Sequence, residues 1–362
     1  MMSDFSERAP RPAVPTPGTV LLWLAAALPL ALSAALILTV ASLTTARADD
    51  DAPACTGKNL LTELQQNDPI KYAAILAESD KIANGKSIFW KLEKPGVRPS
   101  WLLGTMHVTD PRVLTMPKGA PEADKAADTI IVESDEILDD KKAAMALLAK
   151  PELMMFTDGS TISKFLSPAD NAKLEAGLKE RGIPLAAVSR MRPWMISSVV
   201  ALPPCEIARK TKGAQFLDQR IAIEAAAAGK QVKGLETLAD QLQAMADLPV
   251  EFHLKSLIET LQLGDKMQDV VETMTDLYLA GDIGATMPML KIVAPDGNDD
   301  GSDYAAFEQR IILDRNKVMA EHAAPILANG NVFMAVGALH LTGDQGLVEL
   351  FRKQGFTVTA VD

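Results

Sequence analysis

The order of apolar and polar residues predicts short strands toward both ends of the chain and helices between them. Residues 87–93 (SIFWKLE) alternate as a half-buried strand does, and a Pro-Gly turn leads to a second strand at 100–103. Further short strands are predicted at residues 129–133, 231–235, 332–336 and 356–360. We expect these strands to form one sheet.

The segments between the strands carry helical periodicity. Residues 139–228 and 237–280 are predicted to be mainly helical, and one long helix is expected over residues 304–328. The pattern predicts an α/β fold in which a central mixed sheet is covered by a large helical insertion or cap.

The domain organisation follows from the same pattern. We expect a single domain over residues 49–362. Within it, residues 85–140 and 230–362 would form the α/β core, and residues 141–229 would form the mainly helical insertion.

The first 48 residues have the features of a targeting segment. Residues 21–43 are an almost unbroken run of Leu, Ala, Ile and Val, and small residues then precede an acidic start. We expect cleavage after Ala48 and export to the periplasm. The apolar run is also long enough to span a bilayer. The alternative is therefore an uncleaved anchor through residues 19–43, with the protein at the outer face of the inner membrane.

The net charge bears on which partners the protein can bind, and the cysteines bear on the compartment in which it folds. The net charge is −11 and no basic stripe with interleaved aromatic residues is present, so nucleic-acid binding is not expected. The two cysteines, Cys55 and Cys205, both follow the targeting segment. An even number of cysteines in an exported chain suggests a disulfide, and two buried free thiols are the alternative.

Two short stretches far apart in the chain repeat one pattern. LLGTMHVTD (residues 102–110) and AVGALHLTG (residues 335–343) each contain apolar residues, a glycine, two residues and a histidine. Gly104 and Gly337 each end a strand, and His107 and His340 follow at its carboxyl end, where open α/β sheets bind ligands. Either histidine alone would be interpreted as an ordinary loop residue. The repeat favours a shared site.

Glu133 completes a plausible ligand set for a metal ion. It ends the apolar run at residues 129–133, and an ionised carboxylate in that position needs a partner. Two histidines and one carboxylate commonly hold a catalytic divalent ion with an open position. We therefore predict a metal site at His107, Glu133 and His340. These ligands do not decide among Mn²⁺, Co²⁺ and Zn²⁺.

Two further charged residues are candidates for the same site. Arg315, with Asn316, falls inside the apolar face of the helix predicted over residues 304–328. A buried arginine must meet a carboxylate, a phosphate or a polarised carbonyl, and a purely structural ion pair is the alternative. Glu236 ends the short strand at residues 231–235, with an ordinary first-turn acid of the following helix as its alternative.

In these motifs the chain resembles the TraB/GumN family, which includes the TIKI-type proteins. The matching stretches are LLGTMHVTDPRV, TIIVES, KGLETLADQL, LAGDIGAT, DRNKVMAEH and AVGALHLTGDQGLVELFRKQGFTV. They follow the family's order and cover about residues 85 to 360. The two G-x-x-H motifs are the family's hallmark, so the resemblance is specific.

The resemblance implies an α/β core with a helical insertion and a metal-dependent hydrolase or protease activity. By motif, His107, Glu133 and His340 correspond to the family's metal-site candidates. Arg315 corresponds to its recurrent arginine, and Glu236 to the glutamate of the G-L-E-T stretch.

The leading hypothesis is an exported metal-dependent hydrolase whose substrate is a peptide or a small molecule. In it, Glu236 would act as general base and Arg315 would stabilise the oxyanion. The alternative is a non-catalytic periplasmic protein that binds a peptide or ligand, or regulates, through the same cleft. A haem or metal carrier that uses the same histidines is a third hypothesis.

Overall fold

A computed structural model describes residues 55–293 and 302–361 of the protein. The predicted targeting segment, residues 1–48, therefore lies outside the described residues. Within the two described ranges, no helix has the length and apolar character needed to cross a membrane.

Six strands of the described chain form one mixed sheet, in the order β4-β3-β5-β2-β1-β6. β4 (Gln231–Gly234), β3 (Thr129–Val132), β5 (Val332–Gly337) and β2 (Val97–Thr105) run parallel to one another. β1 (Phe89–Lys94) pairs antiparallel with β2 and with β6 (Thr357–Ala360). The predicted α/β class with a mixed central sheet is confirmed.

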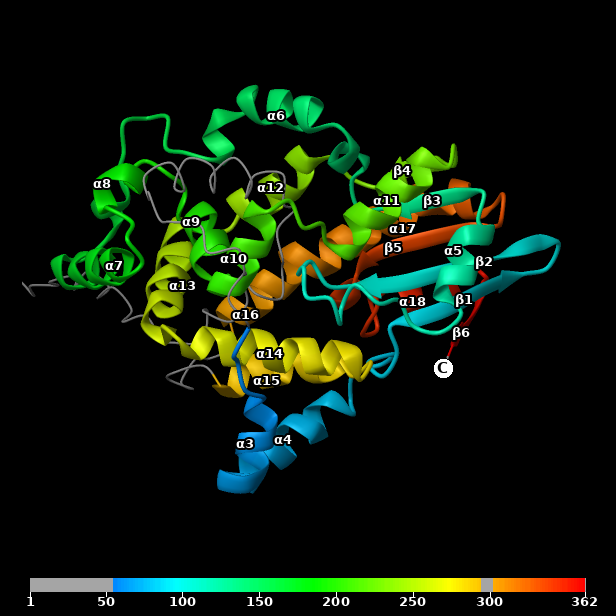
Figure 1. The fold of residues 1–362 in the computed structure, drawn as a ribbon, viewed down its shortest axis with the longest axis horizontal. Helices are drawn as coiled ribbons and strands as arrows, with labels where there is room; N and C mark the ends of the chain where they lie inside the picture. The colour runs from blue at the N-terminus through cyan, green and yellow to red at the C-terminus, as the bar shows by residue number, and fades with distance from the viewer. Residues whose placement is uncertain (1–54, 294–301, 362) are drawn as a thin grey trace, which may run out of the picture.

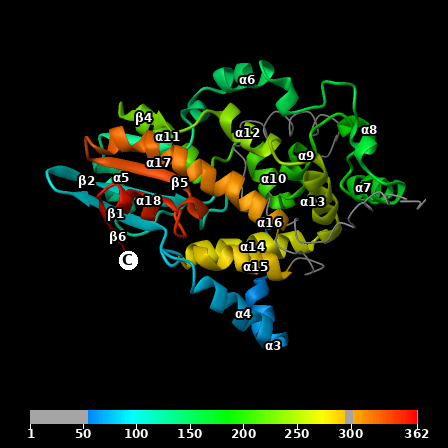
Figure 2. The same cartoon turned by 180° about the vertical axis from the view of Figure 1, so that it is seen from behind.

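Helices cover both faces of this sheet. α17 (Asp314–Leu327) and α18 (Leu347–Lys353) lie on one face, and α5 (Ala120–Ala126) and α11 (Leu217–Ala227) lie on the other (Figures 1 and 2). Successive residues of a strand point to opposite faces. Met334 and Val336 of β5 accordingly pack with α17 and α18, whereas Phe333 and Ala335 pack with α5 and α11.

A helical part lies beside the sheet (Figures 1 and 2). Its longer helices are α6 (Asp140–Leu148), α7 (Pro168–Glu180), α9 (Pro193–Val200), α10 (Pro204–Thr211), α12 (Leu238–Ala246), α13 (Val250–Leu263), α14 (Lys266–Leu279) and α15 (Thr286–Val293). No strand of the described chain falls between β3 and β4. α13 nevertheless packs against α7 and α9, so the helical part combines two separate segments of the chain. The division into an α/β core and an insertion stays a prediction.

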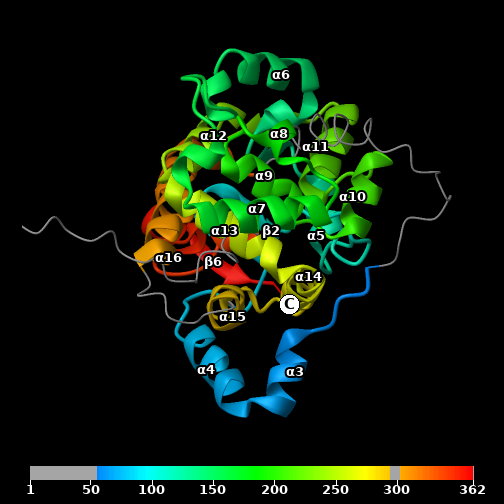
Figure 3. The same ribbon diagram turned by 90° about the vertical axis from the view of Figure 1, so that its left-hand side faces the viewer.

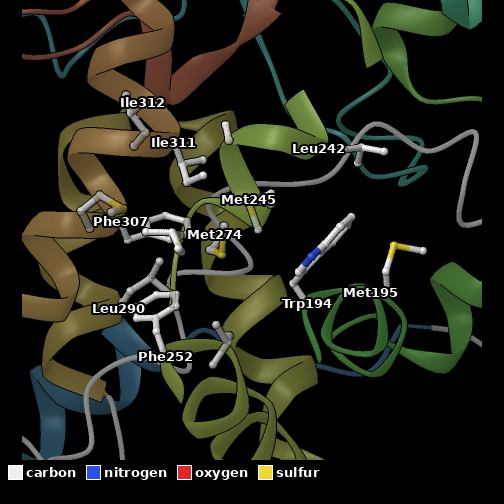
Figure 4. Packing of buried hydrophobic residues seen from close by; sticks show 14 of the residues in the cluster. Trp194, Met195, Leu242, Met245, Phe252, Met274, Leu290, Phe307, Ile311 and Ile312 are labelled. Atoms are coloured by element: carbon white, nitrogen blue, oxygen red, sulfur yellow. The ribbon is translucent and has the colours of Figure 1, made fainter. Parts of the chain in front are cut away.

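The core of the helical part is built from large apolar side chains of several helices (Figure 4). Trp194 of α9, Met245 of α12, Phe252 of α13 and Leu290 of α15 all belong to one buried cluster. Trp194 is fully buried. Phe307, at the end of α16 (Ser302–Phe307), joins the same cluster and stacks on Phe252. This core supports the sheet edge where the candidate residues lie.

The segment predicted as one helix over residues 304–328 is divided by a π-helical turn. α16 leads into η5 (Glu308–Leu313), which is π-helical, and α17 follows. A π turn is wider than an α turn and changes which side chains share a face. Ile311 and Ile312 of η5 therefore join the helical core, while Met319 packs against the sheet. Val318 is 40% exposed, although a uniform helical period over residues 304–328 predicts it on the buried face with Ile311 and Met319.

A disulfide between Cys55 and Cys205 joins the beginning of the described chain to α10. The predicted bridge is thus confirmed, and the described chain has no free cysteine. α3 (Leu60–Asn67) and α4 (Pro69–Ser79) follow Cys55 and lie outside the main body in Figure 3.

We expect the disulfide to contribute substantially to stability, because it closes a loop across 150 residues. A double Cys55→Ser, Cys205→Ser variant should lose about 2–5 kcal/mol of unfolding free energy, measured by urea denaturation. Thiol titration of the denatured, unreduced protein should find no free thiol. Two thiols per chain would contradict the bridge.

Candidate functional site

The carboxyl ends of the four parallel strands meet at one edge of the sheet. Thr105 at the end of β2 lies opposite Gly337 at the end of β5, and Val132 of β3 pairs with residues near the ends of β5 and β4. The candidate residues come directly after these strand ends: His107, Glu133, Glu236 and His340. Strand register therefore brings together residues that are far apart in the sequence.

The two motif glycines allow the histidine loops to pack closely. A Cβ atom on Gly104 would lie 2.9 Å from the Cα atom of Ala338, the residue that follows Gly337. A Cβ atom on Gly337 would lie 3.1 Å from Glu133 Oε1, 3.5 Å from His340 Cδ2 and 4.0 Å from His107 Cε1. The three predicted metal ligands thus lie around the space that the missing side chain of Gly337 leaves open.

A cavity of about 70 Å³ lies at this point. It has room for roughly two water-sized groups. Its lining combines charged and apolar side chains: Thr105, Met106, His107, Glu133, Met274, Tyr278, Ile283, Thr286, Ile311, Ile312, Arg315, Gly337, Ala338, Leu339 and His340. His107, Glu133, Arg315 and His340 therefore reach the cavity, whereas Glu236 does not line it.

Glu133 is buried and receives hydrogen bonds on both oxygens. The N–H of Gly337 donates to Oε1 at 2.8 Å, while Arg315 Nη2 at 2.7 Å and Gln241 Nε2 at 3.0 Å donate to Oε2. Burial by itself would raise the pKa of Glu133. The charge of Arg315 outweighs it, with a further contribution from the N–H of Gly337, and holds the pKa of Glu133 well below its usual range. The carboxylate is therefore ionised.

Arg315 also binds Glu236, with Nε 3.0 Å and Nη2 2.8 Å from Oε2. Burial opposes the charged guanidinium, but Glu236 and Glu133 together raise the pKa of Arg315 above its ordinary value. For Glu236, burial outweighs the attraction of Arg315, so its pKa is raised. One guanidinium is shared by two buried carboxylates, and the pKa is lowered for Glu133 but raised for Glu236.

The imidazole of His340 is held by Asn316 of α17. Asn316 Nδ2 donates to the carbonyl oxygen of Gln345 at 3.0 Å, so its Oδ1 accepts from His340 Nδ1 at 2.6 Å. This contact leaves the lone pair of His340 on Nε2, which lies 3.8 Å from Glu133 Oε1. Burial lowers the pKa of His340 to about 3.

His107 is held on another side, by residues at the start of α11. Its Nε2 lies 3.5 Å from Asp218 Oδ1, and the ring of Phe216 meets the imidazole edge-on at 5.2 Å. Asp218 is 3% exposed and also accepts a hydrogen bond from Thr105 Oγ1 at 2.7 Å.

The sequence reasoning did not single out Asp218 or Gln241. Both are buried polar residues on an otherwise apolar helix face: Asp218 shares its face with Ile221 and Ala222, and Gln241 shares its face with Leu238, Ala244 and Met245. That pattern, which drew attention to Arg315 and Asn316, was also present for these two residues.

Within the described parts of the chain, no three His, Cys, Asp or Glu side chains are arranged as the ligands of a metal ion. The predicted ligands are neighbours around Gly337, but they do not form a closed coordination shell. The other two histidines lie elsewhere: His253 is buried in α13, with Nε2 2.8 Å from the carbonyl oxygen of Met245, and His322 lies exposed on α17.

A larger hollow of about 810 Å³ adjoins the cavity. It lies between α4, α15, η5 and the loop after His340, and its lining shares Ile283, Ile312 and Leu339 with the cavity. Lysine and glutamate side chains accompany apolar ones along it. We call this hollow the groove.

These features define an α/β protein in which two G-x-x-H loops and a buried arginine–carboxylate cluster border one cavity. The model of the TraB/PrgY/gumN family matches residues 88–360, so the chain belongs to this family.

Curated relatives are distant. The chain is 24% identical to a metalloprotease TIKI homolog of Nematostella vectensis, over 77% of this chain and 68% of that protein. It is 23% identical to metalloproteases TIKI2 and TIKI1 of Danio rerio, over 75% of this chain and 60% and 62% of those proteins. The match thus spans about two thirds or less of the relatives' own lengths. No solved structure matches the chain.

The arginine cluster yields a stability prediction. Arg315→Leu would leave Glu133 and Glu236 buried without a cation, and we expect a loss of about 3–5 kcal/mol in unfolding free energy, measured by urea denaturation. The matched control is Arg98→Leu, which breaks the exposed pair with Asp128 and should change stability by no more than about 1 kcal/mol.

A second variant tests the cause. Adding Glu133→Gln and Glu236→Gln to Arg315→Leu should restore part of the lost stability, because the uncompensated charges are removed. Equal losses in the Arg315 and Arg98 variants would show that the cluster does not depend on its arginine.

Proposed function

We propose that the protein is an exported metal-dependent hydrolase that cleaves a peptide, with a divalent ion held by His107, Glu133 and His340. One observation carries the proposal. Two electron-pair donors, His340 Nε2 and Glu133 Oε1, face each other across 3.8 Å at the cavity. The relatives that bear the name metalloprotease support the same class of activity.

The donor set fits a cation. The Oδ1 of Asn316 accepts a hydrogen bond from His340 Nδ1–H, so the nitrogen that faces Glu133 carries a lone pair. An ionised carboxylate oxygen faces it, and no hydrogen bond joins the two atoms. Two such donors, turned toward each other among buried side chains, favour a positive ion between them. Imidazole and carboxylate ligands suit Mn²⁺, Co²⁺ or Zn²⁺.

His107 is the third proposed ligand. Its ring lines the cavity and comes near the open side of Gly337, but it does not complete a ligand group with Glu133 and His340. We propose that binding of an ion draws the His107 ring toward the other two residues.

The chain's own residues have distinct parts in the reaction. A bound divalent ion would polarise the scissile carbonyl and lower the pKa of water. Arg315 lines the cavity and keeps its positive charge, so it is placed to stabilise negative charge on the reacting carbonyl. Glu236, expected from sequence to be a general base, contacts Arg315 and does not line the cavity. We therefore assign it to the positioning of Arg315.

The volumes of the cavity and the groove favour a substrate that extends well beyond the bond to be cleaved. The cavity holds little more than the bond to be cleaved, and the adjoining groove has the volume of a site for a sizeable ligand. Ile283, Ile312 and Leu339 line both hollows. Apolar side chains with charges of both signs along the groove suit an extended peptide, with an apolar residue next to the cleaved bond.

The main test combines metal analysis with peptide cleavage. Untagged wild-type protein should bind one divalent ion and cleave members of a peptide library in the presence of Mn²⁺, Co²⁺ or Zn²⁺. A His107→Ala, His340→Ala variant should lose cleavage and more than about 100-fold in metal affinity, because 10–100-fold is already typical for the loss of an outer partner.

The matched control is His322→Gln, which removes an exposed histidine outside the cavity and should retain both properties. A wild type that binds no divalent ion would overturn the proposal. Tight peptide binding without cleavage under any metal would favour the non-catalytic binding protein.

The proposed export has its own test. A disulfide is consistent with an oxidising compartment such as the periplasm. We expect N-terminal sequencing of the mature protein from a periplasmic fraction to begin at Asp49. A protein that stays in the membrane fraction with its first residues intact would instead show the uncleaved anchor.

A further inference from the structure

Asp218 is a second buried carboxylate close to the site, and its contacts are incomplete. Its Oδ1 accepts the hydroxyl hydrogen of Thr105, while its Oδ2 is buried without a hydrogen-bond partner among the described residues. A buried carboxylate oxygen with no partner is costly. The imidazole of His107 lies beside the same carboxylate, with Nε2 3.5 Å from Oδ1, the oxygen that also accepts from Thr105.

The contact approaches His107 from outside the cavity. His107 lines the cavity and Asp218 does not. Asp218 stands in the first turn of α11, where an acid is also favourable for the helix dipole. That general role explains neither its burial nor its direction toward Thr105 and His107, because a first-turn acid serves the dipole equally well from solvent.

His340 provides an internal comparison. Asn316 accepts a hydrogen bond from the Nδ1–H of His340, so the other ring nitrogen, Nε2, faces Glu133. Asp218 is the corresponding polar neighbour of His107, and it does not line the cavity. The two histidines thus have different partners, a neutral amide for His340 and a carboxylate for His107.

We propose that Asp218 is the positioning residue of His107: its carboxylate accepts the Nε2–H and keeps the lone pair of the ring on Nδ1. Thr105 fixes the carboxylate through its hydroxyl group, and Phe216 limits the tilt of the ring. A carboxylate partner makes an imidazole a stronger electron-pair donor than an amide partner does. The proposal rests on the proposed function, in which that lone pair serves the divalent ion.

The test reads each histidine separately. The chain has four histidines, so a ¹⁵N-histidine NMR spectrum of the metal-free protein is simple enough to assign. We expect wild-type His107 in the Nε2–H tautomer. Asp218→Leu should shift it toward a mixture of tautomers and leave His253 and His340 unchanged. Asn316→Leu should have the converse effect, altering His340 and leaving His107 unchanged.

Metal affinity provides the second readout. Competition with a chromophoric chelator should show that Asp218→Leu weakens Zn²⁺ binding by about 10–100-fold. If that variant does not fold, Asp218→Asn retains the shape and the acceptor but not the charge. It should move the His107 N–H proton resonance upfield and weaken Zn²⁺ binding by a smaller factor.

The outcomes separate the two proposals. A wild-type His107 in the Nδ1–H tautomer, or Asp218 variants with an unchanged His107 spectrum and unchanged affinity, would overturn the positioning role. Equal changes at all histidines would show a purely structural role instead. A wild type that binds no Zn²⁺ or Mn²⁺ would defeat the proposed function, while the tautomer measurement would still decide whether Asp218 holds His107.

Discussion

The site depends on one buried guanidinium that compensates two carboxylates from two different strands. Arg315 reaches from α17 to Glu133, after β3, and to Glu236, after β4. Neither carboxylate would be tolerated there alone, because an uncompensated buried charge costs several kcal/mol. The arginine therefore ties the helix above the sheet to two adjacent strand ends. By keeping Glu133 ionised next to His340, it also sets the charge of the cavity.

The glycines of the two motifs have a steric reason. Gly104 leaves room for the backbone of Ala338, so one histidine loop packs directly on the other. Gly337 leaves room for Glu133 and the two imidazoles. A side chain at either position would push the loops apart or fill the cavity. In each G-x-x-H motif the glycine thus allows the two loops to approach closely, and the histidine lies just beyond the carboxyl end of its strand.

The sequence predicted the strands and the convergence of the histidines because both depend on local pattern plus one general rule. Short strand-like segments gave the six strands, and parallel strands that end at one edge brought His107 and His340 together. The π-helical turn at η5 could not be predicted in this way, since helical periodicity assumes a constant turn. Asp218 is 111 residues from His107, and only the packing of α11 on the sheet joins them.

The two histidine loops are held by different parts of the fold. The disulfide lies next to the contacts that hold the loop of His107. His340 is held from within by α17, through Asn316. The loop of His107 is held from outside: Glu206 of α10 accepts the N–H and the hydroxyl group of Thr109, both at 2.8 Å. Glu206 follows Cys205 directly, so the bridge to Cys55 fixes the helix that fixes this loop. The disulfide is therefore coupled, through Glu206, to the loop that carries His107.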